Sequence, residues 1–122
     1  FADVPQPVYI RENVYLTGAE PYEAEKGALV LEGDASARVV DDGTGVYLET
    51  ELPDSFGSAT TGVVIGTDLP PVRFVDADFD EIDGRPAVLD TDVLGEVKDG
   101  DQTYPAGAVA TLRAGSQRTR LW

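Results

Sequence analysis

The sequence of 122 residues contains no histidine, no cysteine and no methionine. Without histidine or cysteine, the chain has no imidazole base, no thiolate nucleophile and no ordinary zinc site. Its serines have no histidine partner, so a Ser-His-Asp triad within this chain is excluded. The absence of cysteine fits secretion without disulfides as well as it fits a reducing compartment, so it leaves the redox environment open.

Basic residues are also scarce, with nine Lys and Arg against 23 Asp and Glu and a net charge of -14. This charge repels phosphate backbones and anionic lipid, which predicts that the chain binds neither nucleic acid nor a membrane surface. No apolar run approaches the roughly 20 residues that a membrane span needs. The acids are spread along the chain and lysine occurs only at Lys26 and Lys98. Such a composition suggests a high-salt or high-GC source, and in strong salt the self-repulsion of the acids is screened.

The length is normal for one domain, and residues 1–122 are predicted to form a single β-rich domain or a segment of a larger protein. The sequence begins at Phe1 and shows no signal peptide. We therefore expect a processed or excised piece, either a mature secreted chain or part of a longer one, with an extracellular location.

Patterns of short strands dominate. Runs of β-branched and aromatic residues occur at 8–10 and 14–16, and polar and apolar residues alternate over 35–40 and 46–52. The loop at 41–45 contains two glycines, which permit the positive φ of a tight turn, so the two alternating runs predict a β-hairpin. Its apolar face is predicted to hold Val46, Leu48 and Leu52, with Glu49 and Glu51 toward water. Two further strands are predicted at 61–67 and 72–79, separated by Pro70-Pro71.

These patterns predict the fold class. Thirteen glycines and eight prolines occur at intervals along the chain, and such residues separate the strands in proteins built from many short strands. We expect an all-β fold of short antiparallel strands in a sandwich-like, barrel-like or β-solenoid-end arrangement. Helical periodicity is weak, and at most two short helical turns are expected, at 21–26 and 106–112.

One acidic segment carries four candidate metal ligands: Asp76, Asp78, Asp80 and Asp83. On a strand the first three share one face about 7 Å apart, where each pair repels by about 0.6 kcal/mol in water. A hard cation such as calcium would cancel that repulsion and is the candidate cofactor. An EF-hand is rejected, because Glu81 and Ala87 stand where its glycine and bidentate acid belong. An exposed acidic strand without metal is the alternative.

Other residues could contact a sugar or act on one. Arg118 and Arg120 share one face of a predicted strand, where they could bind an acidic sugar such as a uronate or pair with the acidic strand. Asp90 and Asp92 could form a glycosidase pair, although 23 acids produce such spacings by chance. Six aromatic residues could form a sugar-stacking platform or pack structurally: Tyr9, Tyr15, Tyr22, Tyr47, Tyr104 and Trp122.

Two stretches carry a family resemblance. The segment from Val8 to Pro21, with Asn13, Tyr15-Leu16, Gly18-Ala19 and Pro21, resembles a late coil of secreted right-handed parallel β-helix enzymes of the pectate-lyase type. The segment from Phe74 to Pro86 is similar to a closing D-F-D-G-x-x-R-P segment of extracellular β-helix proteins, here interrupted by Glu81-Ile82-Asp83. The resemblance implies a C-terminal part of a polysaccharide-active protein whose catalytic groove lies on earlier coils. It carries no catalytic residue onto this chain.

The functional prediction is a noncatalytic C-terminal β-domain of an extracellular polysaccharide-degrading enzyme. It would fold alone, against a partner chain or on preceding β-helix coils, and would leave an exposed apolar edge or face where those coils stack. The alternative is a free-standing carbohydrate-binding or calcium-binding module from a salt-adapted organism. Catalysis by this chain alone ranks last, because the usual acid-base residues are absent.

Overall fold

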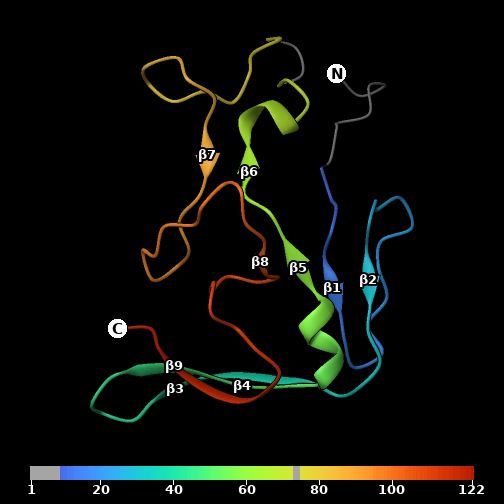
Figure 1. Ribbon diagram of the computed structural model, residues 1–122, viewed down its shortest axis with the longest axis vertical. Helices are drawn as coiled ribbons and strands as arrows, with labels where there is room; N and C mark the ends of the chain where they lie inside the picture. Colours follow the sequence, from blue (N-terminus) through green and yellow to red (C-terminus); the bar gives the residue numbers. More distant parts are fainter. Residues whose placement is uncertain (1–8, 73–74) are drawn as a thin grey trace.

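We describe residues 9–72 and 75–122 of a computed structural model of the chain. The fold in these ranges is all-β, as predicted, and its sheets are small and not closed (Figure 1). The strands, in chain order, are β1 (Val14–Tyr15), β2 (Leu29–Val30), β3 (Ser36–Asp41), β4 (Val46–Leu52), β5 (Thr60–Thr61), β6 (Val64–Ile65), β7 (Val88–Leu89), β8 (Tyr104–Pro105) and β9 (Gly115–Arg120).

The predicted hairpin is the centre of the largest sheet, which has the order β3-β4-β9. Strands β3 and β4 pair antiparallel, with Val39 opposite Leu48. The loop between them is closed because the carboxylates of Asp41 and Asp42 accept the backbone N–H groups of Gly43 and Thr44, both at 2.9 Å. Strand β9 then joins the free edge of β4 from the far end of the sequence, also antiparallel.

The two faces of β4 follow the predicted alternation with one difference. Val46, Leu48 and Leu52 are half-buried and Glu51 is exposed, as expected. The Glu49 side chain, predicted to face water, is only 25% exposed. It is covered because arginines of β3 and β9 flank it on both sides, and the pairing with β9 could not be read from the hairpin alone.

One strand pair is parallel. Val14 of β1 lies opposite Leu29 of β2, and Tyr15 lies opposite Val30. The intervening chain has about the dozen residues that a parallel connection needs. Glu25 ties this connection to β1, because its carboxylate accepts the backbone N–H of Asn13 at 2.9 Å and the hydroxyl of Tyr15 at 2.6 Å. The other pairs of named strands in the described residues are antiparallel, as predicted.

The two strands predicted at 61–67 and 72–79 are corrected by the structure. The first is divided into β5 and β6, and a 3-10 turn, η2 (Gly66–Asp68), follows β6 directly. In the second, Val72 forms an isolated bridge to Ala77, and Asp76 has a φ of +48°, so the chain turns back on itself instead of continuing as a strand. Residues 73 and 74 of that prediction, and Val8 of the strand predicted at 8–10, lie outside the described residues.

Two short 3-10 turns occur in the described ranges, η1 (Asp54–Ser58) and η2, which agrees with the expected number of helical turns. Their places differ from the prediction. The segments at 21–26 and 106–112 each hold a tight turn, closed by the Glu25 N–H to the Tyr22 carbonyl at 2.9 Å and the Leu112 N–H to the Val109 carbonyl at 3.3 Å. Nothing in the described part of the chain has the length and hydropathy of a membrane-spanning helix.

The hydrophobic core is small. Its buried apolar side chains in the described ranges are Phe56 of η1, Ala59 and Val109. Figure 1 shows the β3-β4-β9 sheet at one end of the molecule and the β6–β7 pair toward the other end, with the β5–β8 pair between them. The sheet is thus the most regular surface of the molecule, while the β6–β7 end consists mainly of loops.

Candidate functional site

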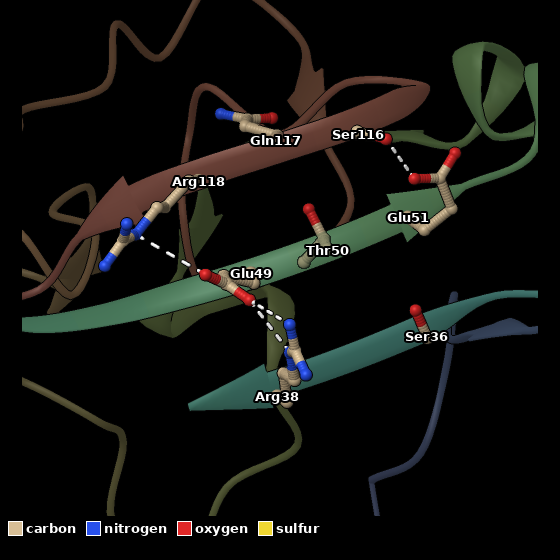
Figure 2. A pocket seen from close by; sticks show the side chains of 8 residues that line it. All are labelled: Ser36, Arg38, Glu49, Thr50, Glu51, Ser116, Gln117 and Arg118. Carbon is tan, nitrogen blue, oxygen red and sulfur yellow. Dashed lines mark hydrogen bonds and ion pairs between the residues drawn. The ribbon is translucent and has the colours of Figure 1, made fainter. Parts of the chain in front are cut away.

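A shallow polar groove crosses one face of the β3-β4-β9 sheet (Figure 2). Its volume is about 650 Å³. Side chains on alternate positions of a strand share a face, so the register of the three strands places their polar residues in rows across the sheet. The groove is lined by Ser36, Arg38, Glu49, Thr50, Glu51, Ser116, Gln117 and Arg118.

The central row contains Arg38 of β3, Glu49 of β4 and Arg118 of β9, which are paired in register. Arg38 donates to Glu49 through Nε at 2.8 Å, and its Nη2 lies 2.6 Å from the same carboxylate. The Nε of Arg118 lies 3.5 Å from the other oxygen of Glu49. A single carboxylate of the central strand therefore bridges two guanidinium groups from the strands on either side of it.

Arg118 is further fixed by two neighbours. Its guanidinium carbon lies 3.9 Å from the centre of the Tyr47 ring, a cation-π contact, and its Nη2 donates to the Asp42 carboxylate. The pKa of Asp42 is lowered to about 2, first because the Thr44 hydroxyl and backbone N–H donate to its carboxylate and then because of Arg118. Asp42 thus stays ionised and holds Arg118 in place at neutral pH.

The neighbouring row contains Ser36, Glu51 and Ser116, and the Ser116 hydroxyl donates to the Glu51 carboxylate. Together the two rows offer guanidinium donors, carboxylate acceptors and hydroxyls that serve as both. These groups suit a ligand with many hydroxyl groups, because each sugar hydroxyl needs both a donor and an acceptor. The groove lining contains no histidine or cysteine, so its ionisable side chains are two arginines and the carboxylates of Glu49 and Glu51.

Of the two predicted ligand-binding arginines, only Arg118 lines the groove. Arg120 lies on the same face of β9, but its guanidinium donates to the carbonyls of Thr44 and Trp122 at 3.2 and 3.3 Å. The predicted pairing with acids occurs for Arg118, although its partners are Asp42 and Glu49 rather than the 76–80 segment. Sequence reasoning missed Arg38; the hairpin pattern, which sets the register of Arg38 against Glu49, was the signal that could have identified it.

The aromatic residues do not gather at the groove. Tyr47 is adjacent to it, but Arg118 covers its ring. Elsewhere the Tyr15 hydroxyl donates to Glu25, and the Tyr104 hydroxyl accepts the backbone N–H of Asp99 at 2.6 Å. These three rings are therefore engaged in separate parts of the fold, which agrees with the structural interpretation of Tyr15.

The four predicted metal ligands lie in the loops between η2 and β7. Asp76 is in a turn, Asp80 forms a bridge to Pro86, and the Asp83 carboxylate pairs with Arg85 at 2.7 Å. Because the chain turns at Asp76, the expected single face for Asp76, Asp78 and Asp80 does not form. Across residues 9–72 and 75–122, no three acidic side chains are placed to share a metal ion. Calcium binding by this segment stays a prediction.

The predicted catalytic pair contains one buried acid. The Asp92 carboxylate accepts backbone N–H groups from Leu94 at 2.8 Å, Glu96 at 3.0 Å and Ala110 at 2.9 Å. These hydrogen bonds, that of Ala110 first, lower the pKa of Asp92. A carboxylate kept ionised by three backbone donors is a poor proton donor, and its geometry is that of a loop-organising residue.

Comparisons with known proteins give one substantial match. The chain is similar to XylC, a protein solved in complex with xylose, at 39% sequence identity and a TM-score of 0.83. The match covers 98% of this chain and 18% of the XylC chain, so this chain spans less than a fifth of that protein's length. No protein-family description matches the chain, and no curated protein matches it. The match supports the carbohydrate context of the resemblance; its β-helix part stays a prediction.

Proposed function

We propose that this chain is a noncatalytic β-domain, C-terminal in position, of an extracellular polysaccharide-degrading protein. The observation that carries the proposal is the match to XylC, which includes nearly the whole of this chain but only 18% of that chain. A unit that is similar over its full length to a small part of a protein solved with xylose is best explained as the corresponding part of a similar sugar-binding protein.

The state of the acids supports a noncatalytic role. A glycosidase uses one carboxylic acid whose pKa is raised, so that it can protonate the leaving group. In the described residues, the carboxyl groups of Glu25, Asp42 and Asp92 have lowered pKa values, each through hydrogen bonds that stabilise the ionised form. Glu49 is bound by two arginines. These acids organise the fold.

A second candidate function is the free-standing carbohydrate-binding module, and the groove on the β3-β4-β9 sheet favours it. Arg38, Glu49 and Arg118 present donors and an acceptor in a fixed row, which suits vicinal hydroxyls or a sugar carboxylate. In this function the isolated chain would bind sugar by itself.

A chimera separates the two functions. The segment of XylC that matches this chain is replaced by this chain, and xylose binding is measured by calorimetry for XylC, the chimera and the isolated chain. We expect the chimera to bind xylose with a dissociation constant within about threefold of that of XylC, a difference below about 1 kcal/mol. The isolated chain should neither bind xylose nor hydrolyse xylan.

Other outcomes contradict the proposal. Loss of xylose binding in a folded chimera would show that this chain is not equivalent to the XylC segment. Saturable sugar binding by the isolated chain, abolished by Arg38→Ala and unchanged by the control Arg85→Ala outside the groove, would favour the free-standing module. Turnover of a polysaccharide by the isolated chain would show that it is an enzyme.

A further inference from the structure

Aspartate is followed by glycine at three places in this chain: Asp42-Gly43, Asp83-Gly84 and Asp99-Gly100. Such a pair can react with itself. The glycine amide nitrogen attacks the side-chain carbon of the aspartate, water leaves, and a cyclic succinimide forms. Glycine permits this step because it has no side chain to obstruct its own amide and because its backbone is conformationally free. The step also needs a neutral carboxyl group, since a carboxylate does not release water, and a glycine amide that is not held elsewhere.

The fold blocks this reaction at Asp42. Its carboxylate accepts the Thr44 hydroxyl at 2.6 Å, the Thr44 N–H at 2.9 Å and a hydrogen bond from Arg118. The two donors of Thr44 are the main reason why the pKa of Asp42 falls from 3.8 to about 2. At a pH well above both values, the neutral fraction of this carboxyl is therefore roughly 60-fold smaller than that of an ordinary aspartate. The Gly43 amide is also held, because it donates to the Asp41 carboxylate at 2.9 Å.

Asp83 is blocked in a similar way. Arg85 holds both oxygens of its carboxylate, one through the backbone N–H at 3.2 Å and the other through Nε at 2.8 Å and Nη2 at 2.7 Å. An adjacent cation favours the ionised form of a carboxyl group, which is the unreactive one. The Gly84 amide donates to the Glu81 carbonyl at 2.9 Å, so the attacking nitrogen is held as well.

Asp99 lacks both of these restraints. Its carboxylate accepts two neutral donors, the Asp101 N–H at 2.9 Å and the side-chain amide of Gln102 at 3.2 Å, and no ion pair reaches it in the described part of the chain. The Gly100 amide makes no hydrogen bond to any described residue. Both residues are exposed, and the space that a Cβ of Gly100 would occupy is empty to 4 Å.

Proximity alone does not separate the three sites. In each of them the aspartate carboxylate accepts the backbone N–H two residues further on, which brings it against the peptide bond between the aspartate and the glycine. The difference lies in what else holds the two reacting groups. At Asp42 and Asp83 an arginine binds the carboxylate and another group accepts the glycine amide, whereas at Asp99 neither contact is made in the described residues.

We propose that Asp99-Gly100 is a site of spontaneous backbone modification, at which Asp99 cyclises to a succinimide and reopens as isoaspartate while Asp42 and Asp83 stay intact. In the first step a bond forms between the Gly100 nitrogen and Cγ of Asp99, and the carboxyl hydroxyl leaves with the amide proton as water. In the second step water adds to the ring. Addition at Cγ restores aspartate, and addition at the main-chain carbonyl gives isoaspartate, so the final mass is unchanged and no co-reactant other than water is needed.

The modification alters the loop that leads into β8. In isoaspartate the main chain runs through Cγ, which adds one carbon between Cα of Asp99 and Gly100. The turn hydrogen bond from the Gln102 N–H to the Asp99 carbonyl, now 3.1 Å, is then lost. The Asp99 N–H, which donates to the Tyr104 hydroxyl at 2.6 Å, precedes the added carbon and keeps its place. We therefore expect a local loosening of this loop, seen as faster amide exchange at Gln102, without unfolding of the chain.

The test follows the three sites in one sample. The folded chain is incubated in mildly acidic heavy-oxygen water below its unfolding midpoint and then digested. Electron-transfer fragmentation distinguishes isoaspartate from aspartate, and each ring opening incorporates one heavy oxygen. Isoaspartate and heavy oxygen should accumulate at Asp99 at least about tenfold faster than at Asp42 or Asp83. In urea the three sites should react within about threefold of one another, because the contacts that distinguish them are gone.

A glycine substitution supplies the matched control. Gly100→Ala should slow the reaction at Asp99 without disturbing the fold, because the added Cβ obstructs the amide but meets no other atom, and Gly100 has no positive φ. Gly62 is equally open and follows a threonine, so Gly62→Ala should leave the rate at Asp99 within about twofold.

Three results would overturn the proposal. One is equal rates at the three sites in the folded chain, and another is a faster reaction at Asp42 or Asp83. The third is a folded chain that forms no isoaspartate at Asp99 although the chain in urea does. The experiment involves neither a sugar nor the XylC chimera, so its outcome is independent of the proposed function.

Discussion

Arg118 lies over the ring of Tyr47 at 3.9 Å from its centre, and 76 positions of sequence separate Arg118 from the Asp42 carboxylate that it also binds. This contact fastens β9, the last strand, to the hairpin of β3 and β4 from the first half of the chain. Tyr47 and Asp42 belong to the hairpin. The planar guanidinium group of Arg118 can stack on the Tyr47 ring and donate a hydrogen bond to the Asp42 carboxylate at the same time. The structural role of Arg118 can therefore be measured separately from ligand binding.

Arg118→Lys should lower the free energy of unfolding by about 1 kcal/mol, because a lysine ammonium cannot stack on Tyr47 while binding two carboxylates. Urea denaturation followed by tyrosine and tryptophan fluorescence measures the change. Arg85→Lys is the control, since Arg85 forms a single exposed ion pair and its replacement should stay within about 0.5 kcal/mol. Equal effects of the two substitutions would contradict the role of the stacking contact.

Asp42 should make the stability depend on pH in the acidic range. Its pKa in the folded protein is about 2, against 3.8 for an ordinary aspartate, so its contribution is fully present well above pH 3.8. The contribution is lost as the pH falls from about 5 toward 2, because protonation then favours the unfolded chain. Urea unfolding at several pH values should show a shallower acid decline for Asp42→Asn than for the wild type. Parallel profiles would contradict this assignment.

Asp92→Ala should destabilise the protein by about 2–4 kcal/mol, because it leaves the backbone N–H groups of Leu94, Glu96 and Ala110 without an acceptor in a buried loop. The exposed Asp101 is the control, and Asp101→Ala should change the unfolding free energy by less than about 0.5 kcal/mol. Thermal and urea unfolding measure both variants. A change below about 1 kcal/mol for Asp92→Ala would show that these hydrogen bonds do not organise the loop.

Thr50→Val should raise the stability by about 1 kcal/mol. The Thr50 hydroxyl is buried and has no hydrogen-bond partner among the described residues, so an isosteric methyl group removes a desolvated polar atom. Thr119 of β9 provides the contrast, because its hydroxyl accepts a hydrogen bond from Gln117 at 3.2 Å. Thr119→Val should therefore be neutral or destabilising in the same urea experiment. Destabilisation by Thr50→Val would indicate that its hydroxyl is satisfied in solution.

Calcium binding by the acidic segment predicts a saturable heat when Ca²⁺ is titrated into the protein, and Asp78→Ala should remove that heat because it removes a central ligand. Calorimetry at low salt avoids screening of the acids. Asp101→Ala, outside the segment, is the control and should retain the signal. The absence of heat in the wild type rejects the metal site and leaves the segment as an exposed acidic loop.

Prediction from sequence succeeded where the signal was local. The hairpin followed from the alternation at 35–40 and 46–52 and from the glycines between them, because residues close in sequence set the register of a tight turn. It failed at 72–79, where a run with strand composition turns at Asp76. Composition favours a strand, but pairing partners decide whether one forms, and none could be deduced for this segment.

The candidate site shows the same division. Arg118 was predicted to bind a ligand because arginines two positions apart share a strand face, and the structure places it in the groove lining. Arg38 and Glu49 became its companions only when β9 joined the edge of β4, which is a contact between distant parts of the chain. Likewise, the exposure of Ile82 depends on how the 81–85 turn is held, and no hydropathy pattern contains that information.

The amino-acid sequence by itself determined the chemistry open to this protein: an acidic chain without imidazole or thiol, built from short strands and turns. The tertiary structure decided which of its charges neutralise one another, which acids organise loops and which apolar side chains remain uncovered. The physical reason is that composition and local periodicity act over a few residues. Ion pairs, buried carboxylates and polar grooves arise where segments far apart in the sequence meet, and contacts between those segments offset the entropy lost in bringing them together.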